Sequence, residues 1–188
     1  SKTTKVIKGE RIGVCFLGSL PAKAKWDLTQ RRNLQAAMRK FILWAVEGTP
    51  VTIHAGLDLG PETVWASEAT EAHRALGGRV RYEAHVYGGV QVGRWKTDDI
   101  RRWRTLQTAS DACHDYKGDG AAGARLDRDR AMIDASETVL VLWDGVEAGH
   151  TWENIVYARA KQRVVVILDP ETLDTRMDAV QIKTSKRR

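Results

Sequence analysis

The segment after the fourth apolar run of the chain carries residue types suited to binding an anion. It reads DGVEAGHTWEN over residues 144–154, and Gly149 and Thr151 stand where a helix is predicted to begin. A helix N-terminus attracts phosphate through its free N–H groups and its partial positive charge. Asp144, at the end of the preceding strand, can accept a hydrogen bond from a sugar hydroxyl or from an arginine. This segment therefore indicates a site for a phosphorylated ligand.

Two arginines, Arg128 and Arg130, lie shortly before the same apolar run. A guanidinium near a helix N-terminus can hold a phosphate through two parallel hydrogen bonds. We expect Arg128 to contact the ligand and Arg130 to lie on a solvated face.

Glycines follow two further apolar runs. Gly18 would let a ligand approach the backbone closely, and Ser19 adds a hydroxyl. Gly56 and Gly60 precede a helix, where backbone N–H groups could bind phosphate, although this segment taken alone favours a simple capped turn with Pro61 at the first helical position. Ligands of open α/β sheets bind beyond the carboxyl ends of the strands. The predicted ligand-binding residues are therefore Gly18, Ser19, Gly56, Gly60, Arg128, Asp144, Gly145, Gly149, His150, Thr151 and Asn154.

Several common sites are not indicated by the sequence. The glycine-rich loops match neither the Walker A nor the GxGxxG pattern, and no GxSxG, HExxH or CxxC occurs. The five histidines show no metal-ligand spacing, so the sequence predicts no metal site and no cofactor.

Five runs of β-type residues must position these loops: 12–17, 51–54, 80–86, 138–143 and 164–168. Three of them are almost continuously apolar, which is typical of strands buried on both faces of a parallel sheet. Helical apolar spacing is seen over 34–45 and 65–76, and further helices are expected within 97–113, 127–135 and 151–161. The glycine-rich stretch 117–124 is predicted to be a mobile loop. The alternation predicts an α/β fold, a Rossmann-like three-layer sandwich with a mainly parallel sheet.

The chain of 188 residues is long enough for one domain with a substantial core. Its net charge of +6 resides at the ends, in Lys2, Lys5, Lys8, Lys183, Lys186, Arg187 and Arg188, while residues 9–180 are nearly neutral. We therefore expect a basic arm over 1–10, a domain over 11–170 and a basic tail over 171–188. The sequence contains two cysteines, no apolar run long enough to span a membrane and no signal-peptide pattern. These features favour a cytoplasmic protein without membrane contact.

Four stretches, in order along the chain, resemble the SLOG superfamily of Rossmann-like nucleotide-binding proteins, and its YpsA-type branch in particular. GLDLGPETVWASEA (56–69) is similar to GxAxGxDxxAAE, and Gln91 with Trp95 to a QxxxW link. RDRAMIDASETVLVLWDG (128–145) is similar to RNRxMVDxSDxLIAVxDG, and GHTWENIVYARAKQRVVVI (149–167) to GGTxNTVxYAxxxGxPVI. The resemblance implies a nucleotide-binding fold and a homodimer or higher homo-oligomer.

Related LOG phosphoribohydrolases release a base from a nucleotide, and by this resemblance Arg128 falls on their catalytic arginine. The glutamate of the LOG pattern is replaced by Asn154, and the nearest acid, Glu153, points about 100° away on a helix. An amide cannot act as a general base or a carboxylate nucleophile. The second glycine of the GGT pattern is His150. The catalytic candidates are Arg128, by this resemblance, and Glu153 as a displaced acid.

Three functions follow in order of preference. The first is a nucleotide-binding sensor or sequestering protein. The second is an N-glycosidic nucleotide hydrolase or transferase, related deoxyribosyltransferases included, in which Arg128 holds phosphate and Glu153 or Asp144 stabilises the transition state. The third, similar to DprA proteins, is binding of single-stranded DNA through the basic tails and the group Arg101, Arg102 and Arg104, with weak, salt-dependent affinity.

Overall fold

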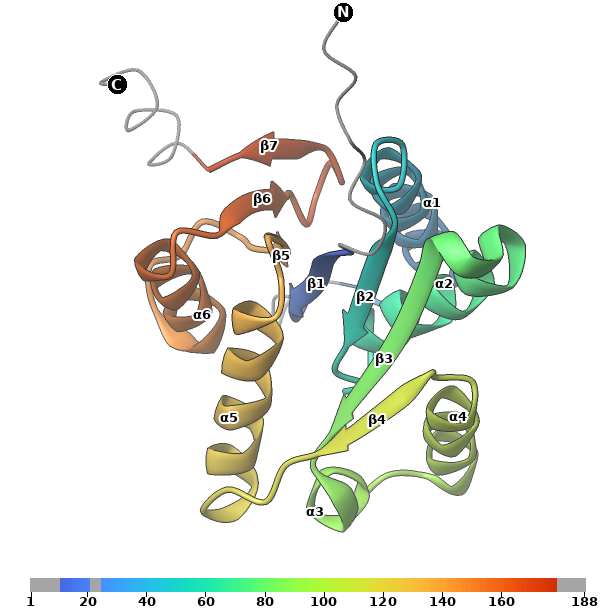
Figure 1. Cartoon of the computed structure of the whole chain (residues 1–188). Coiled ribbons are helices and arrows are strands. Elements are labelled where there is room, and N and C mark those ends of the chain that lie inside the picture. The colour runs from blue at the N-terminus through green and yellow to red at the C-terminus, as the bar shows by residue number, and fades with distance from the viewer. Residues whose placement is uncertain (1–10, 21–24, 179–188) are drawn as a thin grey trace, which may run out of the picture.

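The chain forms one seven-stranded sheet, seen in a computed structural model that describes residues 11–20 and 25–178 (Figure 1). The strands are β1 (Ile12–Gly18), β2 (Val51–Ala55), β3 (Val80–Val86), β4 (Ala112–Asp115), β5 (Thr138–Leu142), β6 (Val164–Leu168) and β7 (Thr175–Met177). Their order is β4-β3-β2-β1-β5-β6-β7, and every neighbouring pair is parallel except β6 and β7.

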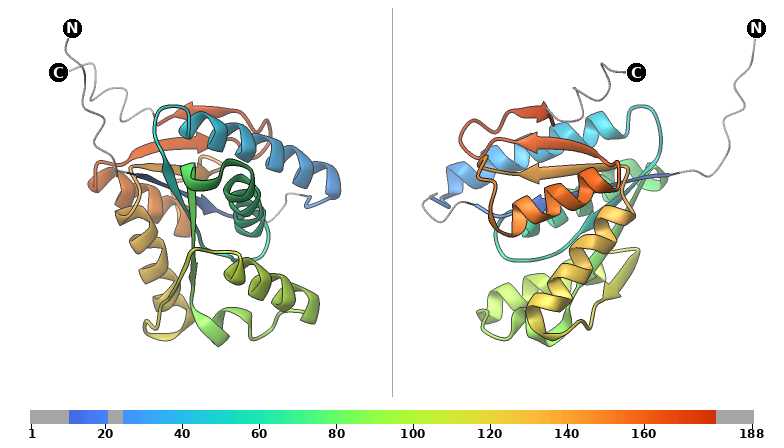
Figure 2. Two further views of the ribbon diagram at one scale, coloured as in Figure 1. Left: turned by 45° about the vertical axis from the view of Figure 1, so that its right-hand side comes forward. Right: turned by 90° about the vertical axis from the view of Figure 1, so that its left-hand side faces the viewer.

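Helices cover both faces of this sheet. They are α1 (Leu28–Ala45), α2 (Pro61–Leu76), α3 (Gly88–Val92), α4 (Thr97–Thr108), α5 (Gly120–Asp134) and α6 (Gly149–Ala160), with a short 3-10 turn at Gly77–Arg79. Figures 1 and 2 show α1 and α2 on one face and α5 and α6 on the other. The predicted three-layer α/β/α fold is confirmed.

Alternate residues of the central strand β1 enter two separate cores, as the period of two along a strand requires. Val14 and Phe16 pack toward α1 and α2, where Phe16 lies 5.9 Å from the buried ring of Trp65. Cys15 and Leu17 pack toward α5 and α6. Burial on both faces explains why the apolar run of β1 is almost continuous.

The strand order reverses between β1 and β5. The chain leaves β1 toward β2 on one side, whereas it leaves β5 toward β6 on the other. In open α/β sheets such a switch point opens a crevice beyond the carboxyl ends of the two strands. The structure describes residues 19–20 and 25–27 of the segment that follows β1, and residues 143–148 follow β5.

The helix α5 begins earlier than predicted. It starts at Gly120, so the prediction of a mobile loop over 117–124 is wrong for residues 120–124. Ala124 is buried, and a Cβ at Gly118 would lie 2.6 Å from the backbone nitrogen of Ala124, so only glycine fits beside the first turn of the helix. The burial of Ala124 offsets the low helix propensity of Gly120 and Gly123, about 1 kcal/mol each.

Two short strands, β4 and β7, were not expected. β7 is fully exposed and β4 largely so, and neither has the apolar alternation by which a strand is recognised. β7 continues the sheet into residues assigned above to the basic tail. The predicted arm 1–10 and tail residues 179–188 lie outside the described part of the chain. No helix within the described ranges is long and apolar enough to cross a membrane.

Candidate functional site

A cavity of about 400 Å³ lies at the switch point between β1 and β5. The residues lining it come from the ends of both strands and from the start of α6: Ser19, Leu20, Trp143, Asp144, Val146, Ala148, His150 and Thr151. We call this cavity the β1/β5 crevice. It brings together four of the residues predicted from the sequence, Ser19, Asp144, His150 and Thr151.

The N-terminus of α6 faces this crevice with its backbone accessible. The N-cap residue, Ala148, has extended backbone and makes no side-chain capping bond, and the first turn carries no acidic residue. Gly149 adopts φ +84°, and a Cβ there would meet nothing within 4 Å. The first N–H groups of α6 therefore have no side-chain acceptor within the described structure, which is the arrangement that binds anions.

The loop after β5 is folded by its own side chains. The backbone N–H of Val146 donates to Asp144 Oδ1 at 3.0 Å, and Trp143 Nε1 donates to the Val146 carbonyl at 2.9 Å. The Trp143 ring stacks on Trp152 with centroids 5.6 Å apart. Gly145 allows this turn with φ +87°. The half-buried Trp143 thus contributes an anchored aromatic edge to the crevice wall.

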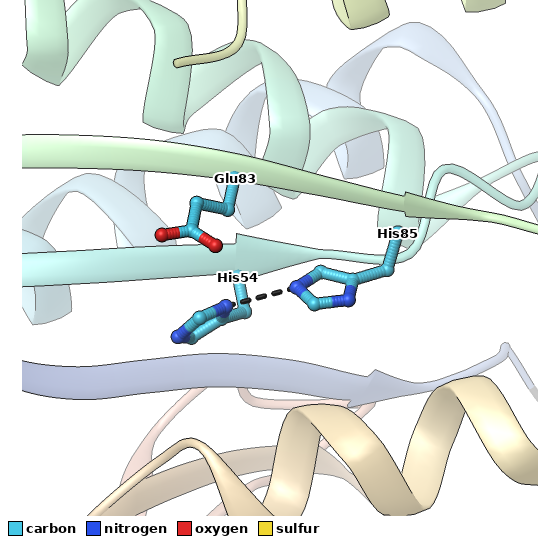
Figure 3. A group of neighbouring side chains, drawn as sticks. All are labelled: His54, Glu83 and His85. Atoms are coloured by element: carbon cyan, nitrogen blue, oxygen red, sulfur yellow. Dashed lines mark hydrogen bonds between the residues drawn. The ribbon is translucent and has the colours of Figure 1, made fainter. Parts of the chain in front are cut away.

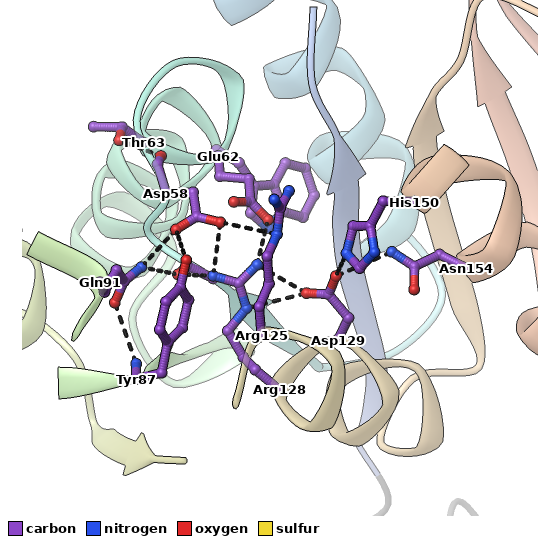
Figure 4. Close-up of polar contacts among 12 residues, drawn as sticks. Asp58, Glu62, Thr63, Tyr87, Gln91, Arg125, Arg128, Asp129, His150 and Asn154 are labelled. Carbon is purple, nitrogen blue, oxygen red and sulfur yellow. Dashed lines mark hydrogen bonds and ion pairs between the residues drawn. The ribbon is translucent and has the colours of Figure 1, made fainter. Parts of the chain in front are cut away.

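Beneath the crevice lies a buried network centred on Arg128, which is 0% exposed (Figure 4). Its Nη1 donates to the Gly56 carbonyl at 2.8 Å and lies 3.2 Å from Asp58 Oδ2. Its Nη2 contacts Glu62 at 3.2 Å and Asp129 at 2.8 Å. Its Nε donates to the same Asp129 oxygen at 3.0 Å. All three guanidinium nitrogens are therefore held by protein oxygens.

Asp129 connects this network to the crevice. Its second oxygen, Oδ2, lies 2.6 Å from His150 Nε2 and accepts from Asn154 Nδ2 at 3.0 Å. Although burial alone would raise the pKa of Asp129, the hydrogen bond from His150 and the Arg128 charge lower it to about 2. His150 keeps 32% of its side chain exposed and lines the crevice. A buried carboxylate thus orients an imidazole that reaches the cavity.

At the end of the network away from His150, acidic side chains compensate the charges of Arg125 and Arg128. Asp58 pairs with both Arg128 and Arg125, and it accepts hydrogen bonds from Tyr87 and Gln91. Burial opposes ionisation of Asp58, but the two arginines lower its pKa. With Asp58 and Asp129 ionised, both arginine charges are compensated, and Glu62 is the surplus carboxyl. Burial raises the pKa of Glu62 well above its ordinary value.

The predicted site residues therefore separate into groups. Gly56, Arg128 and Asn154 belong to the buried network, and a Cβ on Gly56 would lie 2.9 Å from Arg128 Cζ. Gly18 ends β1 with φ +128°. Gly60 is the N-cap of α2 and lines a separate, smaller cleft beside Trp26, Trp95 and Trp103. Glu153 is exposed and does not line the crevice.

Sequence reasoning missed the carboxylates that hold Arg128. Asp58 and Glu62 follow β2, and Asp129 is the neighbour of Arg128 on α5. A signal was present, because both Asp58 and Glu62 fall within the glycine-containing segment after a strand. Their convergence on one guanidinium depends on helix packing, which no local pattern specifies.

A second polar group lies on the sheet (Figure 3): His54 of β2 with Glu83 and His85 of β3. His54 Nδ1 and His85 Nε2 are 2.9 Å apart. Burial lowers the pKa of His54 to about 4 and that of His85 to about 2, so both rings are neutral near pH 7. Neutral imidazoles with a carboxylate are ligands for a transition metal. The sequence showed no such spacing because the residues meet across strands.

Comparison with protein-family models and with curated proteins finds no match for this chain. The resemblance to the SLOG superfamily stays a prediction from the motifs quoted above.

Proposed function

We propose that the protein binds a nucleotide or nucleotide-derived ligand in the β1/β5 crevice, as a sensor or sequestering protein. The observation that carries the proposal is the position of the crevice, at the switch point of the sheet and over the uncapped N-terminus of α6.

The chemistry of the lining supports a ligand that has both a phosphate and an aromatic group. Phosphate would accept from the first N–H groups of α6 and from the Thr151 hydroxyl. Asp144 Oδ2, the oxygen that the Val146 bond leaves free in the loop, is suited to a ribose hydroxyl. The Trp143 edge provides apolar area for a base. Arg128 acts in this proposal through Asp129 and His150, because its guanidinium is buried.

A thermal-shift panel of nucleoside mono- and diphosphates, cyclic dinucleotides, NAD and ADP-ribose tests the proposal. A ligand at 100 times its Kd adds about 2.7 kcal/mol to the stability of the native state. For a chain of this length that raises Tm by roughly 5–10 °C. The nucleotide proposal requires at least one such shift, and a shift with inorganic phosphate equal to that of every nucleotide would contradict it.

A second function, hydrolysis of an N-glycosidic bond in the bound nucleotide, is favoured by one observation. The Asp129–His150 pair, 2.6 Å apart, orients an imidazole toward the crevice, as a general base requires. Glu153 does not line the crevice, so His150 and Asp144 replace it as the candidate groups. Release of free base from the ligand identified in the panel, lost in His150→Gln, would support hydrolysis. Binding without base release supports the sensor alone.

A further inference from the structure

Three neighbouring strands bring imidazole rings and a carboxylate together, away from the β1/β5 crevice. His54 lies on β2, Glu83 and His85 on β3, and His114 on β4. The strand register pairs His54 with Glu83 and His85 with His114. The rings of His85 and His114 stack with centroids 4.7 Å apart. Parallel strands in this register therefore create a continuous row of metal-ligating side chains.

We propose that His54, Glu83 and His85 bind one divalent transition-metal ion, with Zn²⁺ the best match. One ligand atom from each residue lies within 4.8 Å of the other two (Figure 3). Two imidazoles and one carboxylate form a donor set that Zn²⁺ uses with a fourth position left for water. The proposal concerns a site that is distinct from the nucleotide crevice and does not depend on it.

The spacing of the two imidazoles is close to that of a metal site. His54 Nδ1 and His85 Nε2 are 2.9 Å apart. Two nitrogens bound to tetrahedral Zn²⁺ at about 2.0–2.1 Å lie about 3.3 Å from each other. To bind a metal, the two nitrogens must separate by about 0.4 Å and both rings must turn so that their lone pairs point at one position. The hydrogen bond between the rings is then replaced by two bonds to the metal, and the Glu83 carboxylate moves toward the same position.

Outer partners already orient two of the three ligands, as the residues around metal ligands do. The Tyr116 hydroxyl lies 2.8 Å from His85 Nδ1, which leaves Nε2 as the nitrogen that faces His54. His114 Nε2 lies 2.7 Å from Glu83 Oε1, and Arg81 Nε donates to Glu83 Oε2 at 2.9 Å. His114 is partly exposed and Glu83 less so, which gives an ion a route from solvent.

The test is calorimetric titration of the chelator-treated full chain with Zn²⁺, followed by X-ray absorption of the Zn²⁺-loaded protein. We expect one Zn²⁺ per chain and a first shell containing two imidazole nitrogens and at least one carboxylate oxygen at about 2.0–2.1 Å. This measurement needs no variant. A first shell without two imidazoles, or the absence of stoichiometric binding, would overturn the proposal.

Variants then assign the ligands. Glu83→Gln and His85→Gln are expected to weaken Zn²⁺ binding at least 10-fold, and Tyr116→Phe by roughly 10- to 100-fold through loss of an orienting bond. The control is His73→Gln, which removes a partly exposed histidine outside the cluster. Circular dichroism verifies folding of each variant, and Tyr116→Phe serves if the buried-residue variants unfold. Equal affinity of Tyr116→Phe, His73→Gln and wild type would refute the assignment.

Discussion

The substitution Asp129→Asn tests how much the buried network around Arg128 stabilises the fold. The Asp129 carboxylate, 1% exposed, accepts two hydrogen bonds from Arg128 and one each from His150 and Asn154. An asparagine would keep one acceptor oxygen but would turn an NH₂ group toward the NH₂ of Asn154. It would also remove one of the charges that compensate Arg128.

The expected loss in the free energy of unfolding follows from the kind of interaction that the substitution removes, a buried ion pair. Removing one partner of a buried ion pair destabilises a protein by about 3–5 kcal/mol. Because Asp58 and Glu62 still contact Arg128 in this variant, we expect a loss near the lower end, about 3 kcal/mol. The assay is urea unfolding, in which the midpoint should fall while the slope m is unchanged. The control Asp134→Asn changes an exposed aspartate on the same helix, and its pairs should contribute about 0–1 kcal/mol. Equal losses in the two variants would refute the reasoning.

The pH dependence of the same residue gives an independent measure. The pKa of Asp129 is about 2 in the native state and 3.8 ordinarily. Because the native pKa is the lower one, its contribution is complete above about pH 4 and is lost as pH falls toward 2. The shift corresponds to about 2 kcal/mol. The wild type should lose this amount relative to Asp129→Asn across that pH window.

Three further predictions follow from the network and the cores. Burial raises the Glu62 pKa, so as pH rises above about 4.5 the carboxyl ionises more readily in the unfolded state than in the native state, and the free energy of unfolding falls. In urea unfolding, Glu62→Gln should therefore gain stability relative to wild type between pH 5 and 8. Parallel stability curves of the two proteins would contradict this. Gly56→Ala should cost roughly 1–3 kcal/mol, because its Cβ would lie 2.9 Å from Arg128 Cζ, whereas Gly78→Ala, with nothing within 4 Å, should cost little. Burial raises the pKa of Cys15 to about 12, so a thiol reagent should label the native chain once, at exposed Cys113; two labels without unfolding would contradict the described core.

The parts of the fold that sequence predicted are those with a local signal. The strands β1, β5 and β6 were recognisable because both of their faces are buried, which leaves an almost unbroken apolar run. The strand β7 was not predicted, because it lies at the edge of the sheet and all three of its side chains are exposed, so it has no buried apolar residue to mark it. Its pairing with β6 depends on a turn after β6 that no periodicity marks.

The candidate site, like the fold, has residues that the sequence predicts and residues that it does not. His150 and Thr151 were predictable, because the segment after a parallel strand and before a helix must lie at the ligand-binding edge. The burial of Arg128 was not, since its partners come from the segment after β2, from α2 and from α5 itself. The meeting of His54 and His85 likewise depends on the register between two strands.

The position of the ligand is the central claim, and a charge placed at the α6 N-terminus tests it most directly. Thr151→Glu puts a carboxylate on the crevice wall, whereas Val156→Glu puts the same charge on an exposed position of the same helix. Titration calorimetry with the nucleotide that gives the largest thermal shift should show at least a tenfold loss of affinity, about 1.4 kcal/mol, for Thr151→Glu and little change for Val156→Glu. Equal affinities of both variants would contradict phosphate binding at this helix and place the ligand elsewhere.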